Sequence, residues 1–125
     1  MPKEKKKILA VLEDLFFTVK IHDVAKRAGL EVEFLKSEQD VLEKAKQKPM
    51  LILLDLNAHS LHPVNLISKL KGDPETKPIS IIGYVSHVQG ELKQKAQNAG
   101  ADMVLARSAF SQNLPIILKR HSGAF

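Results

Sequence analysis

The sequence predicts an α/β fold with one parallel sheet, and three observations support this. Short apolar runs of strand length alternate five times with amphipathic segments of helical period. The run at residues 50–55, Met-Leu-Ile-Leu-Leu-Asp, stays apolar up to its final acid, as in a strand buried on both faces. The connections are short and rich in turn residues. Strands joined through helices in this way lie parallel, with helices on both faces of the sheet.

The first part of the chain supplies two strand-helix units that precede this central strand. Residues 7–12 form the first expected strand, and from Leu15 the apolar period is helical up to Gly29, the expected C-terminal cap. Residues 30–34 alternate between apolar and polar side chains, as in a half-buried strand near the edge of a sheet. Ser37 is the expected N-cap of the second helix, in a Ser-Glu-Gln-Asp sequence that is similar to a capping box.

The second part supplies the remaining elements. His62-Pro63 marks the start of the third helix, because proline is tolerated in a first turn. The next strand, helix and strand are expected at residues 79–85, 90–99 and 102–106. A short last helix is expected to open at Asn113-Leu114-Pro115 and to run to about Arg120.

Length and composition predict a single domain over residues 1–125, with a basic tail at 1–6 and a C-terminal tail at 121–125. The chain has no cysteine, which excludes disulfides, a thiol nucleophile and a Cys-based metal site. The apolar run near the N-terminus stops at Glu13-Asp14, so it is too short for export or for a membrane span.

The net charge of +5 raises the question of nucleic-acid binding. The basic residues are interleaved with acids over the expected helix surfaces, and one tyrosine with no tryptophan leaves few platforms on which bases could stack. The charge distribution therefore argues against nucleic acid as the partner.

Chemistry-bearing side chains follow several of the expected strands. Because parallel strands end at one edge of the sheet, these residues should converge there. They are Glu13 and Asp14, Asp55 to Asn57, Val85 to His87, and Ala106 to Ser108. Carboxylates with a main-chain oxygen form a hard-cation site of the Mg²⁺ kind. The expected metal ligands are Glu13, Asp14, Asp55 and Asn57.

Asp55 is the candidate nucleophile of this site, because a carboxylate next to a cation can form an aspartyl phosphate. Ser86 and Arg107 are the candidates for holding the phosphoryl oxygens. Purely structural roles remain open as alternatives. Asp55 would then cap its loop, the acids at 13–14 would start a helix, and Ser86 would be a helix N-cap. Histidines 59, 62 and 87 lie in the same loops, where a carboxylate and a histidine could bind a metal such as Zn²⁺, but their spacing fits no metal motif.

The chain resembles the receiver domain of two-component response regulators over nearly its whole length. The matching segments are Lys7-Ile8-Leu9-Ala10-Val11 followed by acids, Leu53-Leu54-Asp55-Leu56-Asn57, Lys71-Gly72-Asp73-Pro74-Glu75-Thr76, Ala99-Gly100-Ala101-Asp102 and Leu105-Ala106-Arg107-Ser108. The resemblance implies a flavodoxin-like, doubly wound sheet of order 2-1-3-4-5 and Mg²⁺-dependent phosphorylation of Asp55 by a histidine kinase. It also implies a cytoplasmic, non-enzymatic signalling protein in a phosphorelay. With no effector domain after Phe125, the output is expected to pass through docking to another protein.

The acids after the first strand depart from the receiver pattern. Receivers usually place a pair of acids directly after the apolar run, but Leu12 stands in the first place. The pair is therefore either Leu12-Glu13 or, with a shift of one residue, Glu13-Asp14. The second alternative keeps a metal site, whereas the first puts a leucine in the place of one of its two acids.

Other positions also depart from the pattern. Val85 stands where receivers have Thr or Ser, and the hydroxyl of Ser86 follows one residue further along the chain. Arg107 stands where receivers usually have a lysine. Val104 takes the place of an aromatic side chain that swings between states. The last helix looks short, which puts in question the usual homodimer face of the fourth helix, fifth strand and fifth helix.

These departures leave a second hypothesis open, a pseudo-receiver adaptor that works without phosphorylation. A third, a small metal-dependent hydrolase on the same sheet, has no nucleophile-elbow or glycine-rich phosphate motif to support it.

Overall fold

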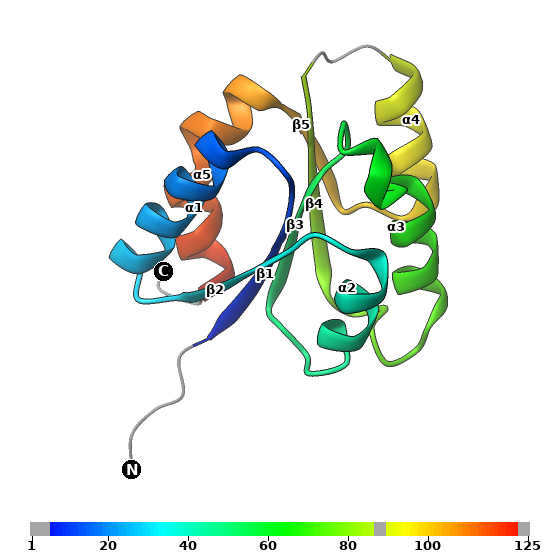
Figure 1. Cartoon of the computed structure of the whole chain (residues 1–125), viewed down its shortest axis with the longest axis horizontal. Coiled ribbons are helices and arrows are strands. Elements are labelled where there is room, and N and C mark those ends of the chain that lie inside the picture. The colour runs from blue at the N-terminus through cyan, green and yellow to red at the C-terminus, as the bar shows by residue number, and fades with distance from the viewer. Residues whose placement is uncertain (1–5, 87–89, 123–125) are drawn as a thin grey trace.

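The computed structural model describes residues 6–86 and 90–122, and in it five parallel strands form one sheet in the order β2-β1-β3-β4-β5 (Figure 1). The strands are Lys7–Val11 (β1), Glu31–Leu35 (β2), Leu51–Asp55 (β3), Ser80–Val85 (β4) and Met103–Ala106 (β5). The helices are Leu15–Arg27 (α1), Glu38–Ala45 (α2), the 3₁₀ turn His59–Leu61 (η1), Pro63–Gly72 (α3), Gly90–Ala99 (α4) and Arg107–Ser122 (α5). The predicted fold class and strand order are confirmed.

Two helical layers cover the sheet, with α1 and α5 on one face and α2, α3 and α4 on the other (Figure 1). The central strand β3 serves both layers because successive side chains of a strand point to opposite faces. Leu51 and Leu53 pack in the α1/α5 layer, whereas Ile52 and Leu54 pack in the other. None of the four is more than 1% exposed, which explains why this strand is apolar without alternation.

The predicted caps and the edge strand are also confirmed. The Ser37 hydroxyl accepts a hydrogen bond from the Asp40 N–H at 3.1 Å and so caps α2. Gly29 follows α1 with a φ of +74°, a conformation that suits glycine. Strand β2 lies at the edge of the sheet, and its apolar side chains Val32 and Phe34 pack toward the α1/α5 layer.

The last helix is where the sequence prediction is wrong. Instead of a short helix from residue 113 to 120, α5 begins at Arg107, directly after β5, and runs through Pro115 into the expected tail. Its side chains at i, i+4 and i+8, Phe110, Leu114 and Leu118, are at most 1% exposed. Burial of this stripe offsets the cost of an internal proline, and Pro115 lies on the exposed side, where water can replace the missing N–H. A short fifth helix is thus no longer a reason to question a homodimer face.

Candidate functional site at the carboxyl ends of the strands

Asp55 ends the central strand at the predicted edge of the sheet and is half-buried. Its Oδ1 accepts a hydrogen bond from the Asn57 N–H at 2.9 Å, and its carbonyl accepts one from the Ala58 N–H at 3.2 Å. Asp55 therefore has the structural role left open above, because it caps its own loop. No hydrogen bond within residues 6–86 and 90–122 reaches its Oδ2, so one carboxylate oxygen remains available for chemistry.

The charged groups predicted to converge on Asp55 lie close enough to change its pKa. Burial raises the pKa of Asp55 above its ordinary value, the hydrogen bond from Asn57 and the positive charge of Arg107 oppose this, and the carboxylates of Asp14 and Glu13 add to it. Glu13, Asp14 and Arg107 thus share one electrostatic site with Asp55, although they are far apart in the sequence.

The structure leaves neither of the expected pairs, Leu12-Glu13 or Glu13-Asp14, free of other contacts. Leu12 is 2% exposed and packs in the α1/α5 layer, so its position belongs to the core. Asp14 is the N-cap of α1: its Oδ1 accepts hydrogen bonds from the Phe16 and Phe17 N–H groups at 2.9 and 3.3 Å. Glu13 is exposed and accepts a hydrogen bond from the Ser60 hydroxyl. The helix-start role of these acids therefore accounts for Asp14.

Arg107, the first residue of α5, is fixed in this site by two contacts. Its guanidinium forms an ion pair with Asp14 Oδ2, and it lies 4.4 Å from the centre of the Phe17 ring. A planar guanidinium can stack on an aromatic ring and bind a carboxylate at the same time. Phe17 and Asp14 together thus hold the Arg107 side chain at this edge of the sheet.

Asn57 and Ser86 join the loop after β3 to the end of β4. The Asn57 side-chain oxygen accepts a hydrogen bond from the Ser86 N–H at 2.7 Å. The main-chain oxygen of Asn57, the expected metal ligand, accepts one from the His59 N–H at 3.0 Å. Ser86 therefore stands at the site, but it contacts Asn57 through its backbone. The helix-cap role of Ser86 depends on residues 87–89, which are not described.

Tyr84 lies beside this site and was missed by the sequence reasoning. It pairs with Asp55 in the register of the sheet, is 2% exposed, and stacks on Phe110 with ring centres 4.6 Å apart. Its hydroxyl has no hydrogen-bond partner among the described residues. Burial and the nearby carboxylates of Asp55 and Asp14 raise the pKa of Tyr84, so it stays neutral. The only sequence signal was a tyrosine in an otherwise apolar strand.

The remaining candidates do not assemble a metal site. Val85 is 1% exposed at the end of β4 and offers no hydroxyl. His62 pairs with Glu38 at 3.8 Å, and His87 lies outside the described residues. Within residues 6–86 and 90–122, no three His, Asp or Glu side chains gather closely enough to hold a metal ion.

Solved structures with the same architecture support the sequence resemblance. A response regulator from Hahella chejuensis superposes with a TM-score of 0.84 at 20% identity, over 94% of this chain and 95% of that one. The receiver domain of a Pseudomonas aeruginosa sensor histidine kinase, with magnesium coordinated in its active-site cleft, gives 0.82 at 18% identity, over 96% and 99%. A phosphorylated cyanobacterial phytochrome response regulator gives 0.78 at 20% identity, over 94% and 91%.

The chain has the receiver-domain fold. The likeness lies in three-dimensional structure, because no protein-family model and no curated protein matches the sequence. Among the described helices, none has the length and apolar character needed to cross a membrane.

The raised pKa of Asp55 makes a prediction for stability. The unfolded chain gives up this proton at lower pH than the folded chain, so stability falls as pH rises from the ordinary Asp pKa of about 3.9 through the raised value. Asp55→Asn keeps an oxygen for the Asn57 N–H and carries no charge. We expect it to be more stable than wild type at pH 7 in urea denaturation, and the difference to disappear at about pH 3. Equal stability at pH 7 would contradict the cause given for the shift.

Proposed function

We propose that this chain is a receiver-type signalling module that acts by docking to a partner protein, with Arg107 rather than a divalent cation as the positive charge of its site. The observation that carries docking is the start of α1, where Leu15, Phe16 and Val19 are 70–73% exposed directly after Asp14. Apolar side chains of this size are costly to leave in water as a group, so they favour a protein partner.

The neighbouring surface has a shape suited to such a partner. A groove of about 850 Å³ runs between α1 and α5, and its lining combines the apolar Phe16, Val19, Val24 and Pro115 with six polar or charged side chains. Ile116, on α5, is 49% exposed. Apolar side chains in a groove between two helices can accept the apolar face of an amphipathic helix, and the polar side chains around them can contact its polar flanks. We therefore assign the output of the module to the α1/α5 surface.

Mg²⁺ does not fit the residues as they lie. Asp14 uses one oxygen to cap α1 and the other to bind Arg107. Glu13 is engaged with Ser60, and the main-chain oxygen of Asn57 with His59. Asp14 is thus held by other contacts, and of the expected ligands only Oδ2 of Asp55 and the second carboxylate oxygen of Glu13 accept no hydrogen bond from the described residues. The guanidinium of Arg107 already offsets negative charge at this place.

Docking is tested by removing the apolar side chains while leaving the site intact. The double variant Phe16→Ser, Val19→Ser is expected to lose the partner that wild type captures from cells of its source, with partners identified by mass spectrometry. Met103→Ser is the matched control, because Met103 is 41% exposed at the start of β5, away from α1. Capture that survives the double variant, or that fails equally in the control, would rule out the α1/α5 surface.

A second candidate function is phosphorylation of Asp55 by a histidine kinase, and its free Oδ2 favours it. In that step Oδ2 attacks the phosphorus atom, and the bond from phosphorus to the kinase histidine nitrogen breaks. Glu13, Asp14, Asp55 and the Asn57 main chain would then have to rearrange around Mg²⁺. Ser86 and Arg107 would contact the phosphoryl oxygens.

An amide NMR titration with Mg²⁺ followed by beryllofluoride, which imitates an acyl phosphate, separates the two candidates. We expect no specific shifts at millimolar Mg²⁺, because Arg107 and the helix cap hold Asp14. Shifts at Glu13, Asp14, Asp55 and Ser86 that vanish in Asp55→Asn but persist in Glu75→Gln, an exposed loop control, would establish the phosphoacceptor instead.

A further inference from the structure

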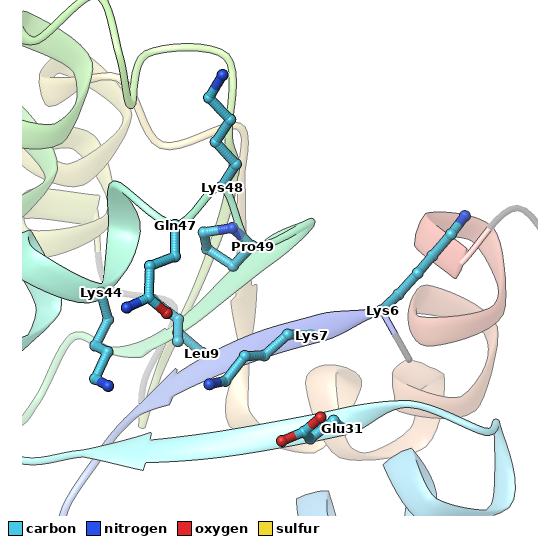
Figure 2. Close-up of a pocket in the computed structure, with 8 residues that line it drawn as sticks. All are labelled: Lys6, Lys7, Leu9, Glu31, Lys44, Gln47, Lys48 and Pro49. Carbon is cyan, nitrogen blue, oxygen red and sulfur yellow. The ribbon is translucent and has the colours of Figure 1, made fainter. Parts of the chain in front are cut away.

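A lysine-lined pocket lies at the amino ends of the strands, opposite the site described above (Figure 2). Its volume of about 540 Å³ is in the range of small-molecule sites. The lining residues are Lys6, Lys7, Leu9, Glu31, Lys44, Gln47, Lys48 and Pro49. Four of the lining residues are thus lysines and one is a glutamate, whereas Leu9 and Pro49 are buried in the floor of the pocket.

Two of the lysines are held in place by one acid. The ammonium groups of Lys7 and Lys44 both pair with Glu33, the second at 3.5 Å. The hydrogen bond and charge of Glu33 raise the pKa of Lys7 despite its desolvation, so this ammonium stays protonated. Glu31 adds a second negative charge near Lys7, but the four lining lysines outnumber the two glutamates, and each ammonium has three N–H donors, so positive charge and donors remain for a ligand. Figure 2 shows the head groups of Lys7, Lys44 and Gln47 directed toward the same end of the pocket.

Lys48 occupies a backbone position that does not suit lysine. Its φ is +60°, in the left-handed region, and the residues with positive φ in the connections after α1 and α4 are glycines, Gly29 and Gly100. The Lys48 ammonium and the Gln47 amide make no hydrogen bond or ion pair with the rest of the described chain. Lys6 and Lys48 extend outward from different sides of the pocket (Figure 2). The rim therefore carries a long cationic side chain at a place where glycine would fold better.

We propose that this pocket binds a small polyphosphate anion. Several negative charges on a compact ligand match the two ammonium groups fixed at Glu33, and the flexible Lys48 side chain can close over the ligand from the rim. This binding is independent of Asp55, which lies at the other end of β3.

The probe is tripolyphosphate, added in an amide NMR titration at a constant ionic strength of about 0.15 M so that general screening does not change. We expect saturable shifts confined to residues 6–9, 31–33 and 44–48. The double variant Lys44→Gln, Lys48→Gln should bind roughly tenfold more weakly. The control Lys93→Gln, Lys95→Gln removes the same charge from α4 and should bind like wild type, as should Asp55→Asn.

A single variant separates binding from folding. Lys48→Gly removes the ammonium and relieves the left-handed backbone, so it should raise the melting temperature and still weaken binding. Shifts spread over all lysine-bearing surfaces, or equal weakening in the α4 control, would overturn the proposal. So would binding of a poly-glutamate peptide in the absence of any response to tripolyphosphate, because the occupant would then be an acidic protein segment.

Discussion

Replacing Phe110 with alanine is expected to lower the free energy of unfolding by about 3–5 kcal/mol. Phe110 is 1% exposed, and its ring stacks on Tyr84 at 4.6 Å with the planes 16° apart. It also lies 5.9 Å from the Phe17 ring, between the two helices of this layer and the sheet. Truncation leaves a cavity beside the rings of Phe17 and Tyr84 that the sheet cannot close. Urea denaturation at neutral pH measures the loss.

Phe16→Ala is the matched control for this variant. Phe16 is 70% exposed on α1, so the same atoms are removed without a cavity, and we expect a change within about 1 kcal/mol. If Phe110→Ala cost no more than the control, the first turn of α5 would not pack on the sheet as described.

Phe110 also shows where sequence reasoning about the fold failed. The strands were predictable because apolar runs such as residues 51–54 are too short for a helix and fit burial on both faces of a sheet. The start of α5 was not, because Pro115 suggests a helix start by a strong local rule. The stripe of Phe110, Leu114 and Leu118 opposes that rule, and its strength depends on tertiary packing that a local pattern does not contain.

The location of the candidate site was predictable from the sequence, whereas the contacts between its side chains were not. Parallel topology alone brings Asp55 and Arg107 to one edge of the sheet. Whether Asp14 serves a metal, a helix cap or an arginine depends on side-chain geometry, and Asp14 takes the last two roles. Tyr84 and Phe17 escaped notice because an aromatic residue in a core carries no sequence signal for a site, yet Phe17 positions Arg107.

Two of the segments that resemble receivers turn out to contact each other. Lys71, near the end of α3, donates hydrogen bonds to the carbonyls of Lys77 and Ile79 at 3.0 and 2.8 Å and to Asp102 Oδ2 at 3.0 Å. The same Asp102 oxygen accepts a hydrogen bond from the Ile81 N–H at 2.7 Å. One ammonium therefore joins α3 to the starts of β4 and β5, and the two sequence segments meet at this contact.

Lys71→Met is expected to lower the free energy of unfolding by about 2–3 kcal/mol. Methionine keeps most of the side-chain volume but leaves two carbonyls and the Asp102 carboxylate without their charged donor. The Lys71 side chain is 16% exposed and the Asp102 side chain 49%, so the part-buried carbonyl of Ile79 is the acceptor that water replaces least well. Urea denaturation gives the loss, and hydrogen exchange of the Ile81 amide should show where the structure loosens first.

Lys95→Met is the control, since Lys95 also has an acidic partner, Glu91 at 3.2 Å, but is 61% exposed. An exposed pair of this kind contributes only about 0.5 kcal/mol. Equal losses in the two variants would mean that Lys71 acts as an ordinary surface lysine. A larger loss for Lys71→Met, with faster exchange at Ile81, would show that its three acceptors hold the amino ends of β4 and β5 in place against α3.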